Sequence, residues 1–198
     1  MMLEQMAQPA DLLTAVAPAT PFDNIADVHA LYEQRIFRFL LLSLRDRDAA
    51  LELTQDTFLS AWRSRAFFRG DCSVATWLMR IAINHLRDHT RTGAFKFWKR
   101  AAATAIDATE LQSQLRHPAS SAESALAAHQ QLGVVWESVN KLTERQRTIF
   151  LLRFVDELEL NEIAEATGLS LPTVKSHLYR ALDHVRTAAR DAGKRDTR

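Results

Sequence analysis

The chain has 198 residues, of which 47% are hydrophobic and 25% are charged. Its 25 Lys and Arg residues almost balance its 24 Asp and Glu residues, so the formal net charge is +1 at pH 7. This composition excludes a disordered or fibrous chain. The single cysteine, Cys72, excludes an intramolecular disulfide framework and a thiolate zinc cluster. No stretch has the pattern of a signal peptide or a membrane span, so we expect a cytoplasmic protein without membrane insertion.

Apolar residues recur at helical spacing almost throughout, without the alternation that is typical of strands. The sequence therefore predicts an all-α fold. A stretch of weak periodicity, Ala-rich and ending in HPASSAES, separates two helical groups and is predicted to be a flexible linker between two small domains. In chain order, the predicted helices cover 28–40, 51–65, 76–90, 132–139, 143–155, 160–166 and 172–189, with a loop at 65–73.

Charge is unevenly distributed along the chain. Between residues 80 and 100 there are six Lys or Arg residues and one acidic residue, and between 175 and 198 there are seven and three. Basic stretches are either solvated helix faces or contacts with a polyanion. Two of them in an otherwise balanced chain indicate two contacts with a polyanion.

The second predicted helix has an acidic face with one apolar member. Glu52, Gln55, Asp56 and Leu59 follow the spacing i, i+3, i+4, i+7 and therefore share one side. This face is either simply solvated or a surface for a basic helical partner.

The third predicted helix has a basic stripe about 60° wide opposite its apolar face. Trp77 lies at the edge of this stripe, and Phe67 and Phe68 precede it in the loop. Such rings are either core aromatics or surfaces for unstacked bases, and we expect one of Phe67 and Phe68 in the core. The predicted core residues are Leu78, Met79, Ala82, Ile83 and Leu86, and the candidate nucleic-acid contacts are Phe68, Trp77, Arg80, Asn84, Arg87 and Arg91.

His85 and His89 on this helix have the i, i+4 spacing of a metal-binding pair. No third ligand suggests itself, so we predict neither a metal nor a cofactor. The sequence also lacks a recognisable nucleophile–base pair or a Gly-rich phosphate loop, which argues against an enzyme.

The C-terminal half has the pattern of a helix-turn-helix in LNEIAEATGLSLPTVKSHLYRAL. Gly168 can end the first helix in a left-handed conformation, Ser170 can cap the second, and Pro172 is tolerated in its first turn. The preceding segment LTERQRTIFLLRF, capped by Thr143, is expected to pack behind the pair. An ordinary amphipathic helical pair would look similar, but the basic outer face favours DNA binding in the major groove. The candidate contacts are Thr173, Lys175, Ser176, Tyr179 and Arg180.

These motifs resemble a bacterial RNA polymerase sigma factor of the extracytoplasmic-function (ECF) group of the sigma-70 family. LELTQDTFLSAWR, FRG and TWLMRIAINHLRDHTR resemble region 2, and LTERQRTIFLLRF with the helix-turn-helix resembles region 4. The resemblance implies a non-catalytic subunit that directs core polymerase to promoters. The implied partners are promoter DNA, the β′ clamp helices and β flap of core polymerase, and an anti-sigma factor.

The resemblance also implies roles for the candidate residues. Glu52, Gln55 and Asp56 match the helix that docks on the β′ clamp helices. The 67–73 loop and the basic stripe match the segments that open and read the −10 element as a single strand, and the C-terminal set matches the −35 recognition helix. Two positions depart from the family pattern: Leu51 replaces the first residue of an acidic pair, and His177 stands where Arg is common.

The resemblance divides the chain into an N-terminal extension (1–23), region 2 (24–92), a linker (93–130), region 4 (131–190) and a basic tail (191–198). Two other functions are weighed against it. A stand-alone helix-turn-helix regulator would need a receiver or ligand-binding domain in the N-terminal half, and the sequence has no such pattern. A nucleic-acid enzyme would have to use His85 and His89.

Overall fold

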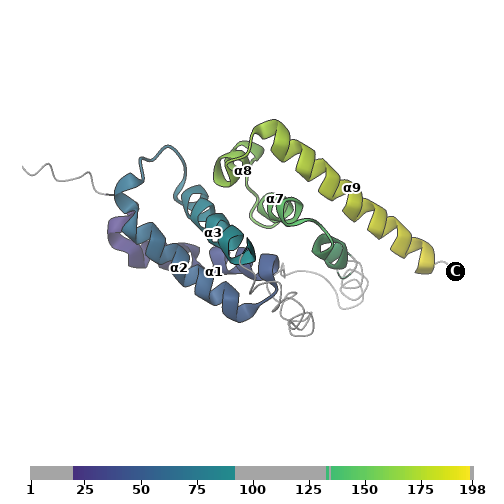
Figure 1. Ribbon diagram of the computed structural model, residues 1–198, viewed down its shortest axis with the longest axis horizontal. Coiled ribbons are helices and arrows are strands. Elements are labelled where there is room, and N and C mark those ends of the chain that lie inside the picture. Colours follow the sequence, from purple (N-terminus) through teal and green to yellow (C-terminus); the bar gives the residue numbers. More distant parts are fainter. Residues whose placement is uncertain (1–19, 92–132, 134, 197–198) are drawn as a thin grey trace, which may run out of the picture.

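Two groups of helices pack against each other in the computed structural model, which describes residues 20–91, 133 and 135–196 (Figure 1). No strand occurs within these ranges, and the all-α prediction is confirmed. The predicted linker at 93–130 lies outside the described residues. The first group comprises η1 (Pro21–Asn24), α1 (Ile25–Leu44), α2 (Arg47–Arg63), η2 (Arg65–Phe67) and α3 (Val74–Arg91); the second comprises a helical stretch at 135–140, α7 (Glu144–Phe154), α8 (Leu160–Thr167) and α9 (Leu171–Asp196).

The helices of the first group begin at polar caps. Asp46 precedes α2 and accepts a hydrogen bond from the Ala49 amide at 3.0 Å, while Ser73 precedes α3 and accepts one from the Thr76 amide at 3.1 Å. These bonds satisfy amides that the first helical turn leaves without a partner. The apolar sides of α1, α2 and α3 then bury large side chains against each other, among them Ile36, Phe39, Leu40, Phe58 and Leu78.

The second group contains the predicted helix-turn-helix. Thr143 caps α7, with Gln146 completing a capping box. Gly168 ends α8 with φ 69°, the left-handed conformation that glycine adopts without steric cost. The Ser170 hydroxyl then accepts a hydrogen bond from the Thr173 amide at 3.4 Å, so the turn is built as its sequence predicts. Val174, Leu178 and Ala181 of α9 are buried, as expected.

One apolar cluster runs through both groups. It joins Phe39 and Leu78 of the first group to Ile149, Leu152 and Ile163 of the second. The contacts between the groups are made chiefly by α3 with α8 and by α1 with α7. In Figure 1, α3 lies beside α7 and α8, whereas α9 runs along the outer edge of the molecule.

The buried carboxylate of Asp156 is bound by two arginines where the two groups of helices meet. Arg35 donates to Asp156 Oδ1 at 3.3 Å and to its carbonyl at 2.7 Å, while Arg38 donates to the Val155 carbonyl at 3.0 Å and lies 3.6 Å from Asp156 Oδ1. Burial raises the pKa of Asp156 to about 6, although both arginines act to lower it. Desolvation of the carboxylate therefore outweighs its two ion pairs.

Arg147 makes a second connection between the groups. Its guanidinium donates to the carbonyls of Val139, Asn140 and Leu142, which fixes the turn that precedes α7. It also donates to the Ser43 carbonyl near the end of α1, at 3.3 Å. Burial lowers the pKa of Arg147 from its ordinary value, but four carbonyl acceptors suit the fork of donors that an arginine presents.

No helix in the described part of the chain is both long enough and apolar enough to cross a membrane.

Candidate nucleic-acid interface

The side of α3 that faces away from the core of the first group carries the predicted basic stripe. Asn84, Arg87 and Arg91 are exposed, and Arg80 is half-buried. The five residues predicted for the opposite side are all buried, so the helical periodicity predicted both sides of α3 correctly. The five are Leu78, Met79, Ala82, Ile83 and Leu86.

Three aromatic rings form a cluster beside this stripe. The ring centroids of Phe68 and Trp77 are 5.4 Å apart, and Phe22 lies 5.2 Å from the first and 4.5 Å from the second. Phe68 is therefore the member of the Phe67–Phe68 pair that packs inward, whereas Phe67 is 77% exposed. Of the two rings, Phe67 is therefore the one exposed to solvent. The sequence alone did not indicate which of the two would be exposed.

Helix α8 covers one end of the stripe with its acidic side. Glu165 Oε1 lies 3.3 Å from Arg80 Nη2, and the Thr76 hydroxyl donates to Glu162 Oε1 at 3.5 Å. Cys72 lies beside this pair: burial raises the pKa of its thiol, and the charge of Glu165 raises it further. Acidic side chains of the second group thus meet the basic stripe of the first group in the fold.

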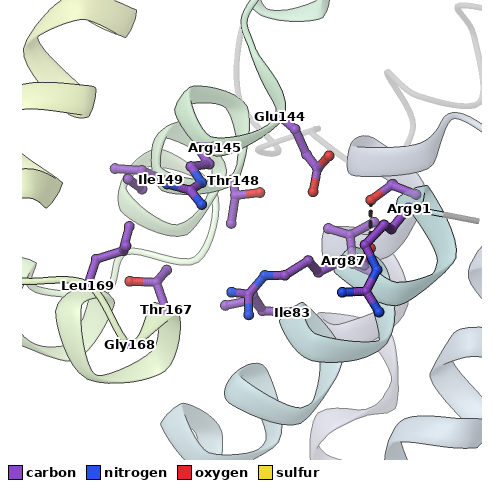
Figure 2. A pocket seen from close by; sticks show the side chains of 12 residues that line it. Ile83, Arg87, Arg91, Glu144, Arg145, Thr148, Ile149, Thr167, Gly168 and Leu169 are labelled. Carbon is purple, nitrogen blue, oxygen red and sulfur yellow. Dashed lines mark hydrogen bonds between the residues drawn. The ribbon is translucent and has the colours of Figure 1, made fainter.

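A pocket of about 540 Å³ lies at the other end of the stripe, between α3 and the second group (Figure 2). Arg87 and Arg91 approach it from α3, and Glu144 and Arg145 approach it from α7. Apolar side chains, among them those of Ile83 and Leu169, also line the pocket. Because two of its arginines are stripe residues, the pocket is a continuation of the same basic surface.

The outward side of α2 carries the predicted acidic patch. Glu52, Gln55 and Leu59 are exposed, with Leu59 at 44%, and Asp56 is half-buried. Trp62, in the last turn of α2, is also 44% exposed. The guanidinium of Arg65 lies over its indole at 4.7 Å, so its ring is packed by a cation on the surface. Trp62 extends the patch by one turn.

The outward side of α9 is fully available. Lys175, Ser176, Tyr179 and Arg180 are exposed, with Tyr179 at 65%. Thr173 is half-buried, and its hydroxyl is 2.8 Å from that of Ser170 at the cap. A lysine, hydroxyl groups and an arginine on one side of a helix are suited to a major groove.

The histidine pair does not form a recognisable metal centre. His85 Nε2 is 2.9 Å from the Ser60 hydroxyl, which ties α3 to α2. Within the described ranges, no group of three His, Cys, Asp or Glu side chains is arranged to hold a metal ion.

Two family models match the chain. "Sigma-70 region 2" covers residues 29–95, which include most of α1 and all of α2 and α3. "Sigma-70, region 4" covers residues 132–185, which include α7, α8 and most of α9. Both regions therefore occur in one chain and in this order, and the described helices correspond to them.

Curated relatives span most of the chain. The RNA polymerase sigma factor YlaC of Bacillus subtilis is 31% identical over 159 residues, which are 80% of this chain and 88% of the relative. The ECF RNA polymerase sigma factor SigW of the same organism is 26% identical over 169 residues, 85% of this chain and 90% of the relative. These matches exclude the stand-alone regulator that the helix-turn-helix alone would have allowed.

A solved structure shares the fold. The sigma factor RpoE from Bartonella quintana, in complex with the anti-sigma factor NepR, superposes with a TM-score of 0.62 at 20% identity, covering 85% of this chain and 98% of that one. Together with the family models and the curated relatives, this likeness accounts for both groups of helices. The chain belongs to the ECF group of the sigma-70 family and directs promoter-specific initiation of transcription by RNA polymerase.

Proposed function

We propose that this sigma factor divides its work among three helix faces: α2 binds core polymerase, α3 with the preceding loop binds the −10 strand, and α9 binds the −35 duplex. One observation supports the division above the others. The three faces belong to different helices, each differs in chemistry from the next, and each presents exposed side chains that its proposed partner requires.

The α2 face fits a basic protein helix. Two polar side chains, Glu52 and Gln55, stand beside the exposed apolar atoms of Leu59, with the carboxyl of Asp56 between them. Charge at the rim would steer a basic partner, while apolar atoms at the centre would supply contact area. We assign this face to the β′ clamp helices.

The α3 face fits a single strand of DNA. Guanidinium groups of Arg87 and Arg91 are available for phosphates, and the Phe67 ring is available for an unstacked base. Trp77 and Phe68 support this surface, with Arg80 and Asn84 completing it. We assign the face to the −10 element after the strands have separated.

The α9 face fits duplex DNA, with Lys175 and Thr173 toward phosphates and Ser176, Tyr179 and Arg180 toward base edges. On its own such a face holds DNA weakly. Both DNA-binding faces act together once core polymerase carries them, because the first contact raises the effective concentration of the second.

The remaining partners follow from the family. We infer that region 4 contacts the β flap of core polymerase and that the protein acts in the cytoplasm, together with polymerase. We also infer that an anti-sigma factor controls it. The last inference is supported by the complex of RpoE with NepR, whose sigma chain shares this fold. In this proposal the protein itself catalyses no reaction. Core polymerase carries out RNA synthesis, and the sigma factor recognises the promoter.

The first test is binding to sigma-free core polymerase on gel filtration. Wild-type protein is expected to co-elute, and a variant with Glu52, Gln55 and Asp56 changed to Ala is expected to elute separately. A matched control changes Glu33 and Gln34 on α1, which are also exposed and polar, to Ala. Retained co-elution of the first variant would refute the α2 assignment, and loss in the control would show that the effect is not local.

The second test concerns promoter opening. Charge reversal at Arg80 and Arg87 is expected to abolish open complexes, detected by permanganate reactivity of unpaired thymines, while co-elution with core persists. Open complexes at wild-type level would refute the assignment of α3 to the −10 strand.

A further inference from the structure

Phe22 lies upstream of the region 2 family match, which begins at residue 29, and yet it is among the most deeply buried side chains of the protein. Its exposed fraction is 0%. The two rings it contacts, Phe68 and Trp77, both belong to the proposed −10 surface. A residue of the N-terminal extension therefore forms the base on which that surface rests.

The short helix η1 holds Phe22 in place. The Thr20 amide donates to the carboxylate of Asp23 at 2.6 Å, which closes the turn around the phenyl ring. The other carboxylate oxygen of Asp23 lies 3.4 Å from Arg65 Nε, at the start of the loop that carries Phe67 and Phe68. The extension is thus attached to this loop at two points, one apolar and one ionic.

The attachment of Phe68 determines the direction of Phe67. Phe68 has an extended backbone, with φ −74° and ψ 109°, whereas Phe67 ends η2. Successive side chains at a 3-10 helix, which has about three residues per turn, point in directions roughly 120° apart, so the two rings cannot face the same side. With the Phe68 ring packed against Phe22 and Trp77, the Phe67 ring is directed outward, where it is 77% exposed.

We propose that Phe22 is a positioning residue for capture of the −10 strand: it holds Phe68 and Trp77 so that Phe67 is presented to an unstacked base. The proposal rests on the assignment of α3 and its loop to the −10 element. Phe22 itself does not touch DNA. Its removal releases the loop, and a base that enters then has to order it, which lowers the affinity for the separated strand.

The test compares equal truncations at two buried phenylalanines of the first group of helices. Phe22→Leu removes the ring beneath the loop, and Phe58→Leu removes a ring that is 4% exposed and packs instead against His29 of α1. Both variants are assembled with core polymerase. The template is a promoter that the wild-type holoenzyme has selected from a random-sequence duplex library, prepared both as full duplex and with the −10 segment already unpaired.

Phe22→Leu is expected to bind the unpaired template several-fold more weakly than wild type, and Phe22→Ala about tenfold more weakly, the size of one lost base–aromatic stack. Phe58→Leu is expected to stay within twofold. Co-elution with core should be unchanged for both Leu variants, which shows that they fold. If Phe22→Ala does not fold, Phe22→Leu decides. Equal binding by Phe22→Leu and Phe58→Leu would overturn the proposal, because Phe22 would then only fill space.

Phe67→Ala separates this proposal from the one on which it rests. If Phe67→Ala and the Arg80 and Arg87 reversals all leave strand binding intact, the −10 assignment itself fails. If they weaken binding while both Phe22 variants do not, the −10 assignment stands and the positioning role of Phe22 is refuted.

Discussion

Arg80 of α3 and Glu165 of α8 form an ion pair of 3.3 Å across the junction between the two groups of helices. The same guanidinium belongs to the surface proposed to bind the −10 strand. The carboxylate of region 4 therefore occupies a position that DNA would need. Both side chains are about 40% exposed, with values of 41% and 38%, so the pair is screened by water and competes only modestly.

Removal of that carboxylate should strengthen binding of single-stranded DNA. For Glu165→Gln we expect a twofold to fivefold higher affinity of the free protein for an oligonucleotide at low salt, from about 0.5–1 kcal/mol of released ion-pair energy. The gain should disappear at high salt. Fluorescence anisotropy measures it, with Glu33→Gln on α1 as a control of equal charge. Equal gains in both variants would mean that only net charge matters.

The reactivity of Cys72 should report on the same contact. Burial is the main cause of its raised pKa, and the charge of Glu165 is the next. Glu165→Gln should therefore lower the pKa of the thiol, raise the thiolate fraction at pH 8 and speed alkylation. The rate at which iodoacetamide alkylates Cys72, compared between the wild type and Glu165→Gln, tests this prediction. An unchanged rate would show that Glu165 does not act on the thiol in solution.

Asp156 should make the folded state less stable as the pH rises. Its folded pKa of about 6 lies above its ordinary value of 3.8, so the protonated form is favoured in the fold. The stabilisation is complete below pH 4 and is lost as the pH passes 6, a change of about 3 kcal/mol for a shift of this size. Asp156→Asn replaces the carboxyl by an amide of similar shape that does not titrate.

Urea unfolding at several pH values tests this linkage. The free energy of unfolding of the wild type, minus that of Asp156→Asn, should fall between pH 4 and pH 7, and the groups common to both proteins should cancel in the difference. A difference that rises over this range would mean that the ion pairs with Arg35 and Arg38 dominate over burial.

Gly168 should be the less replaceable of two glycines in the region 4 match. Its φ of 69° strains any residue with a Cβ, although no atom lies within 4 Å of the added carbon. Gly168→Ala should therefore destabilise the protein by about 1–2 kcal/mol. Gly133 also has open space and is helical without a positive φ, so Gly133→Ala should be neutral or slightly stabilising. Thermal unfolding of both variants measures the contrast.

The helix faces could be predicted from the sequence because they depend on local spacing. The core side of α3, the turn at Gly168 and the cap at Ser170 all follow from residues within a few positions of each other. The inward packing of Phe68 rather than Phe67 does not, because it depends on Phe22, which is far away along the chain. The pairing of Arg80 with Glu165 likewise joins two domains, and no local pattern encodes such a contact.

Trp62 illustrates a different limit. Its spacing from Phe58 suggests an inward ring, but it lies in the last turn of α2, where neighbouring helices no longer cover it. Arg65 covers its indole instead. At a helix end the supply of packing partners, and not the helical angle, determines exposure.

The contacts between the two groups of helices do not depend on the continuity of the chain. Arg35 and Arg38 form ion pairs with Asp156, and Arg147 donates to the Ser43 carbonyl. Apolar side chains of both groups share one core. None of these contacts requires a peptide bond between residues 92 and 132. A protease cut there would leave two fragments that complement each other like the subunits of a heterodimer, and heating would melt them in one transition whose midpoint depends on their concentration.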